Sequence, residues 1–174
     1  MPTRLSRSRS RSWKTVFERW HVGAEPPPYH KKVIPNKTDK IDRRNIGRMI
    51  IPGITLDTTF APAGQGVEKG VNVPGTRSYR NAQFMTPETR STTHIFWNYL
   101  HDFDIDNPNI ALSLRHSLED GFNEDKDIIE AQQRVFDADP NYQLLAIGAD
   151  APLTYFRWLF SRKVEAERNS ARAG

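Results

Sequence analysis

The chain has 174 residues, of which 37% are hydrophobic and 10% aromatic, so it is long and apolar enough for one domain with a core. It contains no cysteine, which excludes disulfide bonds, zinc–thiolate sites and cysteine-ligated iron–sulfur clusters within this sequence. It has no apolar run of about 18 residues to cross a membrane, and its first residues lack the apolar segment of a secretory signal. We therefore expect a cytoplasmic protein without a membrane partner.

The positive charge is concentrated at the amino terminus. The formal net charge is +4, but residues 1–20 alone carry +5 and the other residues sum to −1. The Arg/Ser-rich segment 1–20 is predicted to be a disordered leader, and its alternative role is an arm that binds RNA or another anion. A solvated leader is favoured because the Arg–Ser pairs are few and no aromatic residue lies among them. The near-neutral remainder argues against nucleic acid as a partner.

A Pro- and Lys-rich connector is predicted over residues 21–45. Pro26, Pro27 and Pro28 resist regular structure, and the basic residues around them favour solvent. From Ile46 the pattern changes to alternating apolar and polar residues, which is typical of strands. Residues 46–168 are therefore predicted to form one domain, followed by a disordered tail at 169–174.

Four strands are predicted in the first half of this domain, over residues 46–51, 54–60, 76–85 and 92–103. In the second, Ile54, Leu56, Thr58 and Phe60 share one face. Gly-rich stretches and the turn Thr86-Pro87-Glu88-Thr89 separate the strands. Strands joined by short turns indicate an antiparallel meander.

Two long helices are predicted after the strands. The first begins at Pro108, after a capping Asp106 or Asn107, and ends near residue 137. The second is capped by Asp150, with Pro152 in its first turn. Strands followed by helices indicate an α+β fold in which long carboxy-terminal helices pack on an antiparallel sheet.

One acidic residue lies in the apolar stripe of the first helix. Phe122, Asp125, Ile129, Gln132 and Phe136 fall on one helical face. An unpaired buried carboxylate is costly, so the pattern predicts that Asp125 has a cation, several hydrogen-bond donors or a metal as its partner. The alternative is an acid near a helix start that is stabilised by the helix dipole or paired with an arginine, Arg115 or Arg134.

Several short motifs occur in a set order. They are Thr86-Pro87-Glu88-Thr89, the strand Thr93-His94-Ile95-Phe96-Trp97, and Phe122-x-Glu124-Asp125-Lys126 followed by Glu130-x-Gln132-Gln133. Together they resemble the carboxy-terminal part of the catalytic domain of the Rieske non-haem iron aromatic oxygenases, of the vanillate O-demethylase and dicamba monooxygenase type. The resemblance runs from about Ile46 to about Glu167.

The resemblance implies a partial helix-grip fold and an oxygenase role. It implies iron(II) as cofactor, dioxygen as co-substrate, and hydroxylation or O-demethylation of a small aromatic or apolar substrate. The family's carboxylate ligand to iron matches Asp125, and Gln83, His116 and Asn98 are the expected substrate-binding residues. The resemblance implies three kinds of partner: a separate chain that carries the Rieske half, a reductase, and further copies of this chain in a homo-oligomer.

The sequence departs from the family pattern at the other iron ligands. The family's two histidines lie in a D-x-x-H-x-x-x-x-H segment, and none of the five histidines here has that spacing. The Rieske ligands, C-x-H and C-x-x-H, are absent, so there is no [2Fe–2S] site in this sequence. We therefore expect the chain to be incomplete or inactive alone. The alternative is a non-enzymatic helix-grip module that binds an apolar ligand.

Overall fold

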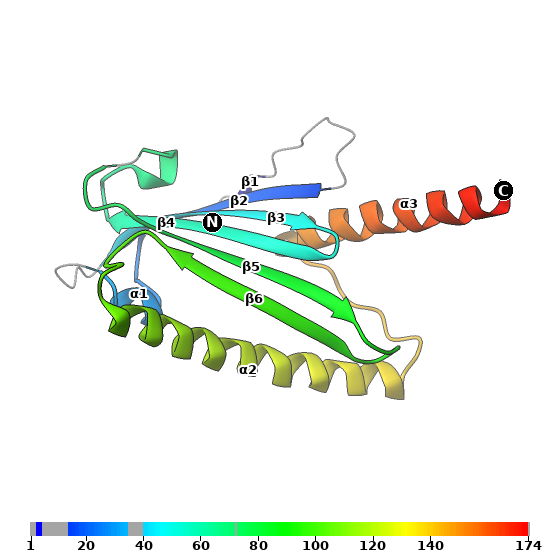
Figure 1. Cartoon of the computed structure of the whole chain (residues 1–174). Helices are drawn as coiled ribbons and strands as arrows, with labels where there is room; N and C mark the ends of the chain where they lie inside the picture. The colour runs from blue at the N-terminus through cyan, green and yellow to red at the C-terminus, as the bar shows by residue number, and fades with distance from the viewer. Residues whose placement is uncertain (1–2, 5–13, 35–39, 72, 174) are drawn as a thin grey trace.

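The computed structural model describes residues 3–4, 14–34, 40–71 and 73–173 (Figure 1). Its elements are the strands β1 (Thr3–Arg4), β2 (Lys14–Ala24), β3 (Ile41–Ile50), β4 (Gly53–Pro62), β5 (Arg77–Pro87) and β6 (Thr93–His101) and the helices α1 (Pro28–Lys31), α2 (Pro108–Ala138) and α3 (Ala151–Ala173). Two short 3-10 helices, Val67–Lys69 and Gly148–Asp150, complete them. The α+β prediction is confirmed.

The six strands form one antiparallel sheet in which the order in space is the order in sequence. This is the predicted meander. In Figure 1, α2 runs lengthwise beside β5 and β6, whereas α3 starts near β2 and extends away from the sheet. The sheet and α2 are therefore the two layers between which a ligand site can form.

The amino-terminal part is more ordered than the sequence analysis expects. Residues 14–24, assigned to the leader and the connector, form β2, which pairs with β3 from Lys14↔Ile50 to Ala24↔Ile41. The segment 28–31 is a helical turn, and β3 begins at Ile41 inside the expected connector. Local composition misled here, because the ladder with β4 satisfies the backbone of a strand rich in charged residues. The rest of the leader, 1–2 and 5–13, lies outside the described residues.

The carboxy-terminal end also departs from expectation. Residues 169–173, predicted as part of a disordered tail, continue α3. Within α2, Gly121 does not break the helix, which runs from Pro108 to Ala138. Asn107 caps this helix by accepting a hydrogen bond from the Asn109 backbone N–H at 3.1 Å, as the sequence predicts.

A buried carboxylate joins the ends of neighbouring strands at one corner of the sheet. Asp42 on β3 is fully buried and accepts hydrogen bonds from the backbone N–H groups of Gly23 at 2.8 Å and Gly64 at 2.6 Å. These bonds tie the end of β2 to the loop after β4. A charged acceptor makes each bond stronger than a neutral one, so the pairing of β2, β3 and β4 is fixed at this corner.

The core lies where α1, the sheet and the first turns of α2 meet. His30 on α1 is fully buried, with its ring 4.4 Å from Phe60 and 5.6 Å from Tyr79. Leu114 closes the cluster from α2, and Phe103 closes it from the loop that leads to that helix. Aromatic rings dominate this core, and they hold the start of α2 against β4 and β5.

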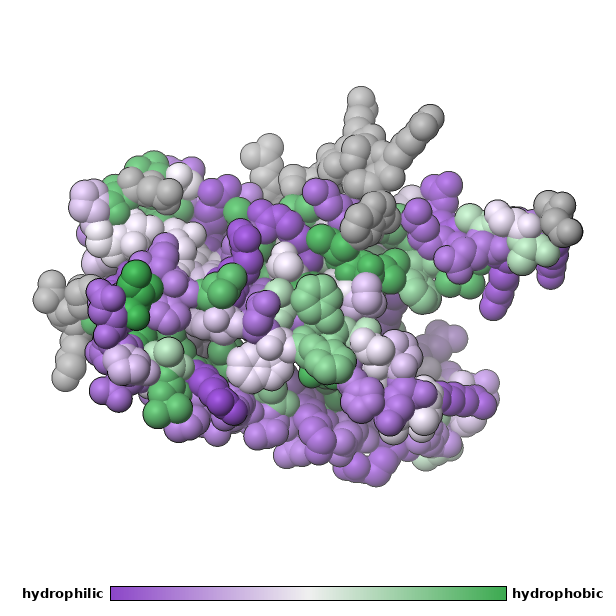
Figure 2. All heavy atoms as spheres, in the orientation of Figure 1, coloured by the Kyte–Doolittle hydropathy of each residue, from purple (hydrophilic) through white to green (hydrophobic). Residues whose placement is uncertain are grey.

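Many large apolar side chains remain exposed elsewhere. On the sheet face opposite α2 these include Phe84, Phe96 and Leu100, which are 49%, 60% and 59% exposed. In Figure 2, apolar side chains lie uncovered among polar ones over the sheet. Ile128 and Ile129 on α2 are also exposed. Exposed apolar surface of this extent is typical of a chain that packs against another protein surface.

The buried histidine predicts a pH-dependent stability. Burial, and secondly the charge of Arg43, lower the pKa of His30 to about 3 from its ordinary value of 6.5. The folded state therefore keeps His30 neutral while the unfolded state binds a proton below pH 6.5. The free energy of unfolding contributed by His30 is complete above pH 6.5 and falls by about 1.4 kcal/mol per pH unit down to about pH 3.

Urea unfolding at pH 7 and pH 5 measures this loss. Between pH 7 and pH 5 the free energy of unfolding of the wild-type chain should fall by about 2 kcal/mol more than that of the His30→Leu variant. His116→Gln is the control, because His116 is exposed on α2 and its substitution should leave the wild-type pH dependence. A His30→Leu variant with the full wild-type loss would contradict the assignment.

Candidate functional site

A cavity of about 310 Å³ lies between the sheet and α2. Its sheet wall comes from alternate residues that share one face of β4, β5 and β6, and its helix wall comes from the second to fifth turns of α2. The lining residues are Tyr29, Leu56, Tyr79, Asn81, Gln83, Tyr99, Leu114, Ser117, Leu118, Gly121, Phe122, Glu124 and Asp125. The cavity is thus mostly apolar with several polar groups, as ligand sites commonly are.

Asp125 lines this cavity, but it is exposed, whereas the apolar stripe predicts a buried carboxylate. Both Asp125 and its neighbour Glu124 are exposed, and both belong to the helix wall. The predicted apolar stripe holds only in part, since Phe122 is half-buried whereas Ile129 is 58% exposed. The physical reason is that, within the described residues, no element covers this side of α2.

Gln83 lies on the sheet wall, as predicted for a substrate-binding residue. Its side-chain amide donates to the Asn81 side-chain oxygen at 2.8 Å, and the Asn81 amide donates to the backbone oxygen of Asn98 at 3.3 Å. These bonds fix the two carboxamides on alternate positions of β5. The structure therefore brings Asp125 and Gln83 to one cavity.

The structure does not bring His116 and Asn98 to that cavity. His116 is exposed on α2, whereas its neighbours Ser117 and Leu118 line the cavity. Asn98 pairs with Ala82 in the β5–β6 register, so its side chain lies on the sheet face opposite the cavity-lining Asn81 and Tyr99. Helical and strand periodicity decide both outcomes, because a shift of one residue changes the face.

Three tyrosines form the inner end of the cavity. The hydroxyls of Tyr29 and Tyr79 lie 2.5 Å apart, and the Tyr99 ring stacks on Tyr79 with 4.9 Å between centroids. Burial, and secondly the nearby Tyr29, raise the pKa of both Tyr79 and Tyr99 well above the ordinary value. Tyr79 and Tyr99 at neutral pH are therefore hydrogen-bonding groups rather than phenolates.

The described residues do not complete an iron site. No three His, Asp or Glu side chains converge in the described part of the chain. Ferrous iron in the two-histidine-one-carboxylate arrangement needs imidazoles beside the carboxylate, and no histidine is among the described residues that line the cavity. The carboxylates present here fit only one part of that ligand set.

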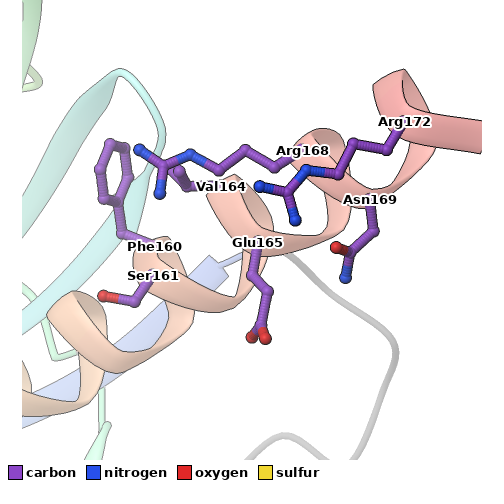
Figure 3. Close-up of a pocket in the computed structure, with 7 residues that line it drawn as sticks. All are labelled: Phe160, Ser161, Val164, Glu165, Arg168, Asn169 and Arg172. Atoms are coloured by element: carbon purple, nitrogen blue, oxygen red, sulfur yellow. The ribbon is translucent and has the colours of Figure 1, made fainter.

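Two further hollows lie away from this cavity. One, of about 450 Å³, includes Asp57 and Arg80. Burial alone would raise the pKa of Asp57, but hydrogen bonds from Arg80 and Arg48 lower it below the ordinary value. The other, of about 500 Å³, has its described lining residues on α3, where Figure 3 shows the Arg168 side chain reaching toward Phe160 and Arg172 farther along the helix. One helix face makes an open surface, so the sheet–helix cavity is the better candidate.

Comparison with known proteins places this fold. Residues 6–166 match the vanillate O-demethylase oxygenase C-terminal domain family. The chain belongs to this family. The match begins 40 residues before the resemblance seen in the sequence, so the segment that forms β2 and α1 belongs to the family domain and not to a separate connector.

The relatives include oxygenase components. The chain is 31% identical to the putative toluene-4-sulfonate monooxygenase system iron-sulfur subunit of Comamonas testosteroni, over 94% of this chain and 47% of that protein. It is 30% identical to a vanillate O-demethylase oxygenase subunit of a Pseudomonas species, over 74% of this chain and 39% of the relative. The chain thus spans about half or less of the length of these relatives.

A solved structure supports the fold. Apo dicamba monooxygenase superposes with a TM-score of 0.70 at 18% identity, covering 95% of this chain and 51% of that one. The predicted partial helix-grip arrangement is confirmed. Among the described residues, no helix has the length and apolar content needed to cross a membrane.

Sequence reasoning missed the tyrosine end of the cavity. Tyr29 lies in the segment assigned to the connector, and only the packing of α1 under the sheet brings it to Tyr79. The positions of Tyr79 and Tyr99 could have been predicted, because they lie at even spacing from Gln83 and Trp97 on β5 and β6 and therefore share their face of the sheet. That periodicity identifies a face but not the hydroxyl contacts on it.

Gly121 offers a test of the helix wall. This residue lies inside α2 and lines the cavity, and a Cβ atom added to it meets no atom within 4 Å. Gly121→Ala should therefore raise the free energy of unfolding by about 0.5–1 kcal/mol, because alanine favours the helix. Gly47→Ala is the contrasting variant and should destabilise, since its Cβ would collide with the Phe17 ring. Urea unfolding measures both, and a destabilised Gly121→Ala would show that α2 lies closer to the sheet.

Proposed function

We propose that this chain supplies one wall of the active site of an aromatic-ring oxygenase component that uses non-haem iron(II) and dioxygen. In the assembled enzyme the substrate is hydroxylated or O-demethylated. The observation that carries the proposal is the position of Asp125 on the helix wall of the sheet–helix cavity. The sequence resemblance aligns this residue with the family's carboxylate ligand. When bound by two histidines and a carboxylate, ferrous iron leaves positions open for dioxygen.

Asp125 is the proposed iron ligand in this chain. It lies on a regular helix turn next to Phe122, whose ring is 5.3 Å from Trp97 of β6. That aromatic contact fixes the helix turn against the sheet and so positions the carboxylate at the cavity. Gln83, on the opposite wall, is the proposed substrate-contacting residue.

The chain is proposed to be inactive alone. Histidine ligands and the Rieske cluster would come from residues outside this sequence, which spans about half of its relatives. The exposed apolar residues of β5, β6 and α2 support this, because they offer a surface for a second polypeptide. Electrons would come from a separate reductase, since relatives are named as components or subunits of multicomponent systems. The cytoplasmic location and a homo-oligomer remain predictions.

A second candidate is a non-enzymatic binder of apolar ligands. The cavity favours it, because its apolar side chains and volume suit a small ring compound without any metal. The two candidates differ in iron binding. A binder retains ligand but never acquires iron, even when histidines are supplied.

Iron stoichiometry under anaerobic conditions tests the oxygenase proposal. The chain alone should bind no stoichiometric iron(II). The partner for this test is a polypeptide, encoded by a neighbouring reading frame, that carries C-x-H, C-x-x-H and D-x-x-H-x-x-x-x-H. The complex of the two chains should hold one mononuclear iron per chain in addition to its cluster. Asp125→Asn should abolish the mononuclear iron while leaving the cluster absorbance.

Asp127→Asn is the matched control. Asp127 is an exposed acid on the same helix, two residues away, that does not line the cavity. Its substitution should keep the mononuclear iron and activity. Full iron content in the Asp125→Asn complex would overturn the proposed ligand role, and an assembled complex without mononuclear iron in any variant would favour the binder.

A further inference from the structure

The inner end of the cavity has hydroxyl groups that can donate further hydrogen bonds. Tyr29 and Tyr79 contribute two hydroxyl hydrogens, and their mutual bond at 2.5 Å uses one of them. The other hydrogen can be donated to a third acceptor, and the buried Thr58 hydroxyl beside Tyr79 is one such group. The Tyr99 hydroxyl is also buried and has no partner among the described residues. A buried hydroxyl without a partner is costly, and here a ligand in the cavity would supply one.

The carboxamides beside these phenols are held in place by bonds of their own. Asn81 accepts from Gln83 and donates to the β6 backbone. Each amide keeps one further N–H, which adds to the donors of the tyrosines. The inner end therefore suits a group that accepts hydrogen bonds.

The two ends of the cavity differ in charge. Glu124 and Asp125 lie at one end, whereas no Lys, Arg or His is among the described residues that line the cavity. Lys32 reaches the helix wall from outside, where it donates to the Ser117 hydroxyl at 2.8 Å and is itself exposed. An anionic ligand would enter beside two carboxylates without a lining cation, which is unfavourable.

The ends are separated along the cavity. Tyr79 and Gln83 are four residues apart on β5, about 14 Å at the strand rise. Leu114 and Asp125 are eleven residues apart on α2, about 16 Å at the helix rise. Between them, Leu56, Leu118 and Phe122 present apolar surface. This arrangement suits an aromatic ring lying lengthwise with one polar substituent toward the tyrosines.

We propose that the Tyr29–Tyr79 pair and Tyr99 form the orienting end of the substrate site, and that they select an uncharged aromatic compound with a hydrogen-bond-accepting oxygen at that end. The inference rests on the proposed function and adds the substrate class. Tyr99 acts as a specificity-determining residue, because its hydroxyl distinguishes an oxygen from a carbon at the same place. The reacting end of the ring then lies toward Asp125.

Three ligands of nearly the same shape test this on the metal-free full chain. Acetophenone carries a neutral acceptor, α-methylstyrene replaces its oxygen with a carbon, and benzoate carries a charge. Dissociation constants from NMR titration should rank acetophenone tightest and benzoate weakest. Tyr99→Phe should weaken acetophenone binding about threefold to tenfold and change α-methylstyrene binding less than twofold.

Tyr142→Phe is the control, because Tyr142 is half-exposed and does not line the cavity. Tyr29→Phe is a second variant that removes one donor at the same end. It should also weaken the binding of acetophenone and leave the binding of α-methylstyrene nearly unchanged. Tightest binding of benzoate, equal losses for acetophenone and α-methylstyrene, or no binding of any ligand would overturn the inference. Since no iron is present, these results are independent of the ligand role of Asp125.

Discussion

The packing of His30 against Phe60 and Tyr79 is the contact on which the rest of the site depends. It joins α1 to the middle of the sheet, and Leu114 extends the same cluster to α2. The start of α2 is thereby anchored to β4 and β5. Because α2 is one uninterrupted helix, this anchor also sets where its later turns lie, including the turn that carries Asp125.

Anchoring the helix at one end produces the asymmetry of the cavity. The anchored end is closed by buried and half-buried tyrosines, whereas the far end has exposed carboxylates. A neutral, hydrogen-bonding end and an acidic, open end have different chemical uses. The first can orient a ligand, and the second can contribute to a metal site that other residues complete. The exposed apolar surface around the open end is consistent with a structure that another polypeptide covers.

Much of this fold follows from the sequence, and the failures have physical causes. Alternation at Ile54, Leu56 and Phe60 and the capping of α2 by Asn107 are local signals, and both elements form as expected. β2 was missed because its stability comes from pairing with β3, which its own composition does not reveal. Family resemblance and helical spacing both led to Asp125, but neither gives its exposure, which depends on what covers the helix. The predicted placement of His116 and Asn98 at the cavity is wrong, because each lies one position away in sequence from residues that face the cavity, and its side chain therefore points to another face.

The central claim is that the Asp125 carboxylate, at the open end of the sheet–helix cavity, is one ligand of a mononuclear iron site. Crystallography of the assembled oxygenase, with anomalous scattering measured at the iron edge, tests this most directly. The account predicts an isolated iron peak in the cavity at a bonding distance of about 2 Å from an Asp125 carboxylate oxygen. A mononuclear iron bound elsewhere, with Asp125 turned to solvent, would contradict it.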